Sequence, residues 1–274
     1  MSNAACLPVS ATYSVVIPAF NAEKTIKACL ASVIEQTHAP LEVFVIDDFS
    51  NDATEEAVRL CEGQFAAAEI RLVYFRLAQN AGPSVARNKG ISMAQGSFIA
   101  FLDADDLWHT YKLAIIDRFA NSSNAGLIYH SYTEKTEFYA ETNNAGYDAK
   151  FLPIYQMLLR NPAATPCTVV RKQHALKFDQ SMRYCEDYDL WLRIAECAPV
   201  LRIIGPPLTR LGRPPLTPGG LSGHILKMRI GEARVYYNFC RRSLLTRVWI
   251  LPGLLILSLL KHLYSRICGW TRQT

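Results

Sequence analysis

The stretch FIAFLDADDLW, residues 98–108, joins an apolar run to three closely spaced carboxylates. Residues 98–102 have the pattern of a buried strand, and Asp103, Asp105 and Asp106 follow it directly. Acids are costly at the end of a buried strand unless something there needs negative charge. The D-x-D spacing lets two aspartates offer oxygen ligands to one divalent cation. A loop of Asx turns and helix caps would explain the same spacing without a metal.

The segments before this stretch alternate between strand and helix patterns. Buried strands are predicted at residues 13–20, 41–50 and 70–77. This alternation predicts an α/β fold with a parallel sheet and right-handed crossovers. Two acids at positions 47 and 48 end the second strand, as the D-x-D acids end the fourth. Because open α/β sheets bind ligands beyond the carboxyl ends of their strands, we expect both groups of acids to line one crevice.

Helical segments separate these strands. The first shows one apolar stripe over residues 26–33, and Asn21 stands where a helix cap is expected. Asp52 and Glu55 resemble a capping box at the start of the second. We also expect a helix within 80–96, a helix around 186–196, strands at 125–132, 167–171 and 200–204, and a long loop over 205–223.

Charge is unevenly distributed along the 274 residues. The net charge is +5, but residues 225–274 hold nine Lys and Arg and one acid, Glu232, which gives them +8 and leaves −3 for the rest. A hydrophobic content of 50% excludes a disordered chain, and eight cysteines without a CxxC pair are typical of reduced structural thiols. We expect the mildly acidic body and the basic tail to do different jobs.

Four segments resemble a known family, the inverting, sugar-nucleotide-dependent glycosyltransferases of family 2, which have the GT-A fold. The segments are SVVIPAFNAEKTIKACLASVIEQT, LEVFVIDDFSNDAT, NAGPSVARNKGISMAQGSFIAFLDADD and EDYDLWLR, in this order within residues 12–204. The resemblance implies a Rossmann-like, mostly parallel central sheet flanked by helices, with a C-terminal helical extension. We therefore expect a catalytic domain over residues 12–224 and a basic, apolar helical tail over residues 225–274.

The resemblance also implies a donor side for the crevice. The backbone near Ala19 and the side chains of Asn21 and Glu23 are expected to line a nucleotide pocket. Asp48 is expected to accept the ring N–H of the base, with uracil as the expected base. Arg87 is expected to reach a phosphate or the base, unless it is only a solvated arginine on a helix face.

The D-x-D acids take separate roles under the same resemblance. Asp103 is expected to hold the ribose or to support a metal ion, with Ala104 beside the bound donor. Asp105 is the expected ligand of Mn²⁺ or Mg²⁺. Asp106 is expected to cap the next segment, or to contact the metal ligands without binding the metal itself.

The ED pair of EDYDLW supplies the expected catalytic base. Inverting transfer needs a group that takes the proton of the acceptor hydroxyl while that oxygen attacks the sugar. The resemblance places this role at Asp187, with Glu186 and Asp189 as rivals. Asp187 would also serve as a plain helix cap. The resemblance further suggests a phosphate contact beyond this helix, for which Arg210, Arg213 and His224 are candidates.

The tail contains thirteen uncharged residues, 248–260. At about 1.5 Å per residue they reach about 20 Å, short of the roughly 30 Å of a bilayer core, and Pro252 and Gly253 interrupt them. We expect an interfacial helix on an anionic membrane, with packing on the catalytic domain or on a second subunit as the alternative. Its polar face would carry Ser258, Lys261, His262, Ser265 and Arg266.

The function expected from these patterns is metal-dependent, inverting transfer of a sugar from a nucleotide-diphosphate donor to a hydroxyl acceptor. The tail suggests a lipid-linked acceptor, as in the assembly of bacterial surface polysaccharide. No signal-peptide pattern begins the sequence, and no nucleic-acid motif accompanies the basic tail, so we expect a cytoplasmic protein at the inner face of the cell membrane. One alternative is a nucleotide-sugar-binding module without activity. Another is a phosphatase of the haloacid dehalogenase type, although Asp106 and Leu107 do not fit its signature.

Overall fold

The computed structural model describes residues 11–135, 146–213, 223–242 and 248–271, with side chains up to residue 261. The start of the chain, where no signal peptide is expected, lies outside these residues. Residues 214–222 of the predicted loop over 205–223 also lie outside them, as do the side chains of the predicted polar face at positions 262, 265 and 266.

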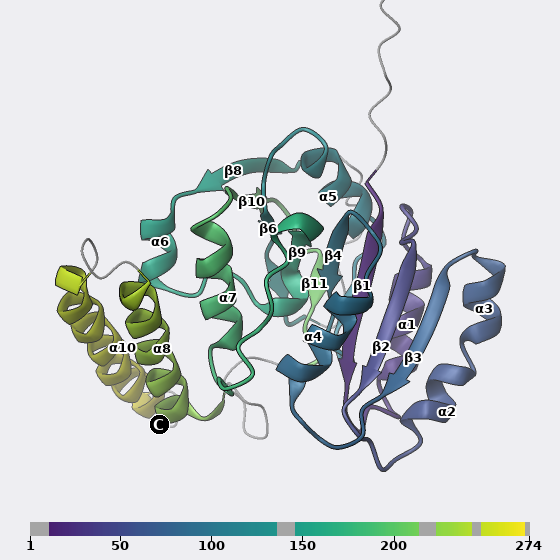
Figure 1. Cartoon of the computed structure of the whole chain (residues 1–274), viewed down its shortest axis with the longest axis horizontal. Helices are drawn as coiled ribbons and strands as arrows, with labels where there is room; N and C mark the ends of the chain where they lie inside the picture. The colour runs from purple at the N-terminus through teal and green to yellow at the C-terminus, as the bar shows by residue number, and fades with distance from the viewer. Residues whose placement is uncertain (1–10, 136–145, 214–222, 243–247, 272–274) are drawn as a thin grey trace, which may run out of the picture.

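A mixed sheet of eight strands forms the centre of the molecule (Figure 1). Its first four strands in the chain are parallel, and they place the carboxyl ends of β1, β2 and β4 at one edge. In spatial order the strands are β3 (Arg71–Arg76), β2 (Glu42–Asp47), β1 (Tyr13–Ala19), β4 (Phe98–Phe101), β9 (Thr168–Arg171), β6 (Leu127–Tyr129), β10 (Val200–Ile204) and β8 (Asp148–Leu152).

The second half of the sheet contains the antiparallel strands that make the expected sheet mostly, and not purely, parallel. The predicted strand at 167–171 is β9, and it runs antiparallel to both of its neighbours, β4 and β6. The sequence patterns missed β8, which pairs antiparallel with β10. A strand that follows a long irregular connection is free to enter the sheet in either direction, whereas a short helical crossover requires a parallel partner.

Helices cover both faces of the sheet, and each face has its own hydrophobic core. Alternate side chains of β1 divide between them: Val15 and Ile17 join one core, and Val16 joins the other. The first core includes the predicted stripe of α1. The helices that contribute to it are α1 (Ile26–Ile34), α2 (Thr54–Arg59), α3 (Glu62–Ala67) and α5 (Lys112–Ala120), and α4 (Pro83–Met93), α6 (Ile154–Leu159), α7 (Glu186–Ala195) and α8 (Ile225–Arg241) cover the other face.

Two predicted helix caps are wrong. α1 begins at Ile26, and Asn21 lies outside it with a positive φ of 50°. The side chain of Asp52 accepts hydrogen bonds from the backbone and hydroxyl of Thr54, so it forms a local turn rather than a capping box with Glu55. Short polar side chains bind whichever backbone groups lie nearest, and the sequence does not say whether those belong to a helix.

A small second sheet holds the chain beside the D-x-D acids. It contains β5 (Leu107–Trp108), β11 (Thr209–Arg210) and β7 (Tyr132–Thr133). β11 lies within the stretch predicted as loop. Just after it, Gly212 approaches the Asp105 carbonyl so closely that an added Cβ would lie 1.9 Å from that oxygen. Only glycine fits this approach, which keeps the following residue, Arg213, next to the acids.

The C-terminal segment forms a pair of packed helices at the end of the molecule opposite α2 and α3 (Figure 1). α8 packs on α7, and its Val235, Tyr236 and Phe239 are buried in the second core. A short 3-10 turn, η4 (Val248–Ile250), leads into α10 (Leu251–Thr271), which packs on α8. Among the described residues, every helix is too short or too polar to cross a membrane.

Candidate active site

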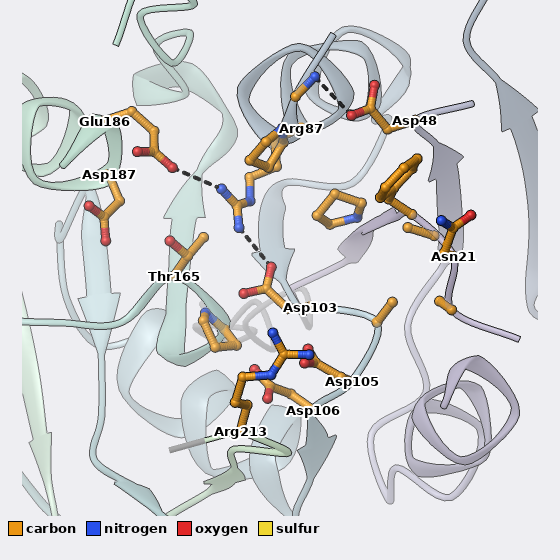
Figure 2. A pocket seen from close by; sticks show the side chains of 18 of the residues that line it. Asn21, Asp48, Arg87, Asp103, Asp105, Asp106, Thr165, Glu186, Asp187 and Arg213 are labelled. Atoms are coloured by element: carbon orange, nitrogen blue, oxygen red, sulfur yellow. Dashed lines mark hydrogen bonds and ion pairs between the residues drawn. The ribbon is translucent and has the colours of Figure 1, made fainter. Parts of the chain in front are cut away.

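A cleft of about 1040 Å³ opens at the carboxyl ends of β1, β2 and β4 (Figure 2). The structure brings together here almost all residues predicted for the site. Glu23 is the exception, because it is exposed and does not line the cleft. The predicted residues that do line it are Ala19, Asn21, Asp48, Arg87, Asp103, Ala104, Asp105 and Asp187.

Asp48 holds the backbone at the entrance to α4. Its two carboxylate oxygens accept the N–H groups of Ala81 at 2.7 Å and Gly82 at 2.8 Å. Gly82 has a φ of 89°, which favours glycine at this turn. The side chain is therefore already engaged, and the expected contact of Asp48 with the ring N–H of a base stays a prediction.

Asn21 and Glu23 connect the loop after β1 with the loop after β2. The Asn21 side-chain oxygen accepts the N–H of Asn51 at 3.0 Å, and Glu23 accepts the N–H of Ala53 at 3.1 Å. Both are predicted nucleotide contacts, but in the structure their side chains satisfy backbone donors. Their direct effect is to fix the shape of the cleft wall on the β1–β2 side.

Arg87 joins the two groups of acids across the cleft (Figure 2). One guanidinium nitrogen lies 2.7 Å from Asp103 and the other lies 3.4 Å from Glu186. Its side chain is 7% exposed, and its Nε has no hydrogen-bond partner among the described residues. Arg87 lines the cleft while it holds both acids, and its expected contact with a donor phosphate or base stays a prediction.

The acids after β4 form a crowded negative cluster. Burial and then the charge of Asp103 raise the pKa of Asp105, and they raise the pKa of Asp106 to about 8. Asp106 accepts the N–H of Gly212 at 2.9 Å, as expected for a residue that caps a neighbouring segment. Arg213 lies beside Asp105 and Asp106 in Figure 2, and its charge favours the ionised form of Asp105.

This cluster fits a divalent cation that is shared with a substrate. No group of three or more His, Cys, Asp or Glu side chains in the described part of the chain is arranged to hold a metal alone. Asp103 and Asp105 supply two carboxylates on the cleft wall, and burial and then the charge of Asp103 raise the pKa of Asp105. Mg²⁺ in phosphate-transfer sites is commonly held by one or two carboxylates with substrate oxygens and water completing the shell.

The start of α7 presents the second pair of acids. Cys185, directly before the helix, has a left-handed φ of 58°, which turns the chain into the cleft. Burial and the charge of Asp187 raise the pKa of Glu186 to about 7, despite the Arg87 contact. Burial also raises the pKa of Asp187, and the hydrogen bond from Asn161 at 3.0 Å opposes this rise. Both acids face the acids of β4 across one cleft.

Asp189, the rival candidate for the base, points away from the cleft. Its carboxylate accepts hydrogen bonds from Arg193 at 2.7 Å and from Asn238 at 3.3 Å, and it is not among the cleft-lining residues. Trp191 is fully buried in the second core and is not available to stack on a sugar. His224 packs edge-on against Tyr184, outside the residues that line the cleft.

Part of the cleft comes from residues that the sequence patterns did not indicate. Thr165 and Pro166 belong to a 3-10 turn, η1 (Thr165–Cys167), which forms one wall. The buried ammonium of Lys112 supports this wall by donating to the Pro166 carbonyl at 2.7 Å, and burial lowers its pKa to about 7. A proline-containing segment between two strands was the available signal, but its position depends on contacts from α5 that are distant in sequence.

Comparison with known proteins identifies related sequences. The family model described as Glycosyl transferase family 2 matches residues 14–177. The Escherichia coli UDP-Glc:alpha-D-GlcNAc-diphosphoundecaprenol beta-1,3-glucosyltransferase WfgD is 35% identical over 186 residues, which cover 66% of this chain and 68% of that protein. A glycosyltransferase of Rickettsia conorii, described as uncharacterized, is 34% identical over 188 residues, 66% of this chain but 30% of its own length. This chain thus aligns with under a third of that relative.

Solved structures show the same fold at low sequence identity. TarS of S. aureus in complex with UDP has a TM-score of 0.66 at 19% identity, covering 96% of this chain and 75% of that one. The mannosyltransferase PcManGT of Pyrobaculum calidifontis, in complex with GDP-Man and Mn²⁺, has a TM-score of 0.63 at 17% identity, covering 94% and 76%. At these identities the likeness concerns the arrangement of the chain.

Proposed function

The chain belongs to glycosyltransferase family 2 and has the expected GT-A fold, and from this premise we propose that it is a metal-dependent, inverting glycosyltransferase. It moves one sugar from a nucleotide-diphosphate donor, a UDP-sugar, to a hydroxyl acceptor. The UDP in the name of the Escherichia coli relative and the UDP bound to TarS support the choice of nucleotide.

One observation carries this proposal: Asp103 and Asp105 face Asp187 across a single cleft. The first pair suits a cation-bound diphosphate, and Asp187 suits an attacking hydroxyl. Transfer with inversion requires the nucleophile and the leaving group on opposite sides of the anomeric carbon. A cleft with a diphosphate site on one wall and a base on the other has this arrangement.

Asp187 acts as the general base in the proposed reaction. Its carboxylate takes the proton of the acceptor hydroxyl while that oxygen bonds to the anomeric carbon and the bond to the diphosphate breaks. Asn161 holds the carboxylate in place, and its burial raises the pKa toward that of a useful proton acceptor. Arg87 keeps Glu186 and Asp103 at a fixed separation, which positions the two walls.

Asp105 and Asp103 would hold the Mn²⁺ or Mg²⁺ ion, which when bound neutralises the diphosphate leaving group. Arg213 lies close enough to this cluster to add positive charge beside the donor. The Mn²⁺ in the mannosyltransferase structure supports the assignment of a divalent ion. Asp48, Asn21 and Ala19 shape the nucleotide end of the cleft, and Ala104 also lines it. Glu23 lies outside the cleft and supports its wall by accepting the N–H of Ala53.

The acceptor we propose is a saccharide on a lipid carrier, used in polysaccharide synthesis at the inner face of the cell membrane. A diphosphoundecaprenol-linked sugar in the name of the Escherichia coli relative supports this acceptor class. The exposed apolar residues of α10 support a membrane-bound tail beyond residue 224. The acids retained in the cleft favour an active enzyme over a binding module, and the family match favours transfer over phosphatase chemistry.

A thermal-shift screen of nucleoside diphosphates, each with and without Mn²⁺, tests the proposal. We expect UDP to raise the melting temperature only when Mn²⁺ is present, and Asp105→Ala to abolish this rise. Asp187→Asn should keep the full rise and lose sugar transfer. A UDP-induced rise that is the same without Mn²⁺, or that persists in Asp105→Ala, contradicts the metal assignment.

A further inference from the structure

The two C-terminal helices turn apolar side chains toward solvent. On α8, Leu226, Ile230 and Tyr237 are 60%, 62% and 53% exposed, and their spacing of four and seven places them on one face. The exposed apolar residues of the following segment are Trp249, Ile250, Leu255, Ile256, Leu259 and Leu260. Trp249, at 85% exposure, is the most exposed of them. We call these residues, with those of α8, the apolar ridge.

The polar side of α10 faces the protein instead of solvent. Ser258 is buried and donates to Glu232, and Lys261 lies 2.6 Å from the same carboxylate. Arg229 completes the group at 2.6 Å from Glu232. The packing that the sequence left as an alternative to membrane contact is therefore present. It uses Ser258 and Lys261 together with the half-buried Leu251 and Leu254, and it leaves Leu255, Ile256, Leu259 and Leu260 exposed in the described part of the chain.

A row of cations runs along α8 beside the apolar ridge. Lys227, Arg234 and Arg241 are exposed and follow one another at intervals of seven residues, which is two helical turns. Arg234 also donates to Ser181. Glu232 is the one acid among residues 225–274, and it is turned inward and paired. The outer surface of α8 therefore combines apolar and cationic side chains without a carboxylate.

We propose that α8 and α10 together dock on the surface of an anionic lipid bilayer, with the apolar ridge in the headgroup region and the cation row on lipid phosphates. An anionic membrane matches both features, because apolar burial and attraction to acidic lipids add together. Trp249 and Tyr237 are residue types that favour the membrane interface. A second copy of this surface fits less well, because a two-fold contact would bring cations toward cations with no exposed acid to pair them.

This docking would set the orientation of the cleft. Met228, next to Lys227 in α8, lines the cleft together with Tyr184 and Asp187. Lys227 lies 5.9 Å from the ring centre of Tyr184. The cation row thus begins at the end of the cleft that holds the proposed base, and an acceptor held in the bilayer would enter there. This consequence rests on the proposed function, whereas the docking itself does not.

Co-sedimentation of the full chain with vesicles tests the docking. Vesicles of phosphatidylcholine alone are compared with vesicles of equal parts phosphatidylcholine and phosphatidylglycerol. Each cation near an acidic membrane is worth about 1 kcal/mol, so Lys227→Gln with Arg241→Gln should weaken binding to the anionic vesicles about 30-fold. Leu226→Gln with Ile230→Gln should weaken binding to both kinds of vesicle.

Matched controls separate a local surface from general charge or hydrophobicity. Lys24→Gln with Lys27→Gln removes the same charge from exposed positions at α1, and Leu60→Gln changes an exposed leucine near α2. These variants should bind vesicles as the unchanged chain does. Equal losses in the controls, or normal binding by both the cation-row variant and the apolar-ridge variant, overturn the proposal. A dimer in light scattering that Ile256→Ser dissociates overturns it in favour of a second copy.

The same variants distinguish failure of the docking from failure of the proposed enzyme. The cation-row variant should retain the UDP-induced thermal shift and the transfer to a water-soluble acceptor. A chain that binds anionic vesicles but transfers no sugar leaves the docking standing and removes the proposed function. A chain that transfers sugar in solution but does not bind anionic vesicles leaves the proposed function standing and removes the docking. Substitutions are better than truncation here, because loss of α10 would deprive buried Glu232 of Ser258 and Lys261.

Discussion

The acids that end β2 and the acids that begin α7 lie at the same cleft, which Asp48, Glu186 and Asp187 line, but the chain uses the two groups differently. The acids that end β2 have their oxygens filled by the protein: Asp48 accepts two backbone N–H groups, and Asp47 accepts Ser50 and Tyr74. Of the acids that begin α7, Glu186 pairs with Arg87 at 3.4 Å, and Asp187 accepts hydrogen bonds from Asn161 and from the backbone of Tyr188. Burial nevertheless raises the pKa of both Glu186 and Asp187. The difference teaches that position at the edge of the sheet marks the site, whereas burial that raises the pKa of a carboxyl group marks the residues suited to proton transfer.

The largest expected effect comes from Asp187→Asn. The amide cannot take the proton of the substrate hydroxyl. We therefore expect the rate of transfer to fall by about 10²- to 10⁴-fold, the usual contribution of a general base. The free energy of unfolding and UDP affinity should change little. Asp189→Asn, two residues along the same helix, is the control, and it should lose stability through its contacts with Arg193 and Asn238 rather than lose chemistry. Similar transfer rates in Asp187→Asn and Asp189→Asn would contradict the assignment of Asp187 as the base.

Arg87→Met tests whether the acids after β4 and the acids that begin α7 are joined by a buried bridge. Removing the guanidinium leaves Asp103 and Glu186 without their cation, and we expect a loss of about 3–5 kcal/mol in the free energy of unfolding. Arg59→Met is the control, because this exposed arginine pairs with Glu55 and Glu62 and should be worth less than about 1 kcal/mol. Denaturant unfolding measures both, and equal losses would contradict a special role for Arg87.

Asp48→Asn should reverse the pattern of Asp187→Asn. The amide leaves one of the N–H groups of Ala81 and Gly82 without an acceptor, and we expect a loss of about 1–3 kcal/mol in the free energy of unfolding. The rate of transfer at saturating donor should remain close to that of the unchanged chain. If the rate falls as far as it does in Asp187→Asn while stability is kept, Asp48 belongs with the chemically active acids.

The smallest expected effect is a shift in pH dependence. The proposed base works only when ionised, so its raised pKa should place the acidic limb of kcat/KM above the usual range of an aspartate. Asn161→Ala removes the hydrogen bond that lowers the pKa of Asp187, and it should move this limb to higher pH. Asn121→Ala on the surface should leave it in place. An unmoved limb in Asn161→Ala would assign the titration to another group.

The sequence predicted the parallel half of the fold and the position of the cleft. β1 to β4, the stripe of α1 and the span of α7 follow from periodicity, because each is set by residues close together in the chain. The direction of β9 and the presence of β8 depend on how long irregular segments return to the sheet. Local patterns carry no information about that return.

The sequence was less informative about what each site residue contacts. It placed Arg87 near the cleft, but its partner Glu186 lies 99 positions away, and the ion pair exists only because the fold brings the start of α7 within reach of this side chain. The commitment of Asp48 to two backbone donors was likewise hidden, because it depends on the turn at Gly82. Residue type indicated which side chains lie at the cleft. Which of their polar atoms are already bound by the protein could be learned only from the structure.

The bridge made by Arg87 has a consequence for the expected sugar selectivity of this chain. A single rigid fork spans the gap between the end of β4 and the start of α7, and a lysine has no comparable two-pronged geometry. Changes in the surrounding loops alter what borders the opening without altering that span. We therefore expect side chains at the rim of the cleft to determine selectivity among sugars of different size. The distance between the diphosphate site after β4 and the base at the start of α7 should stay constant.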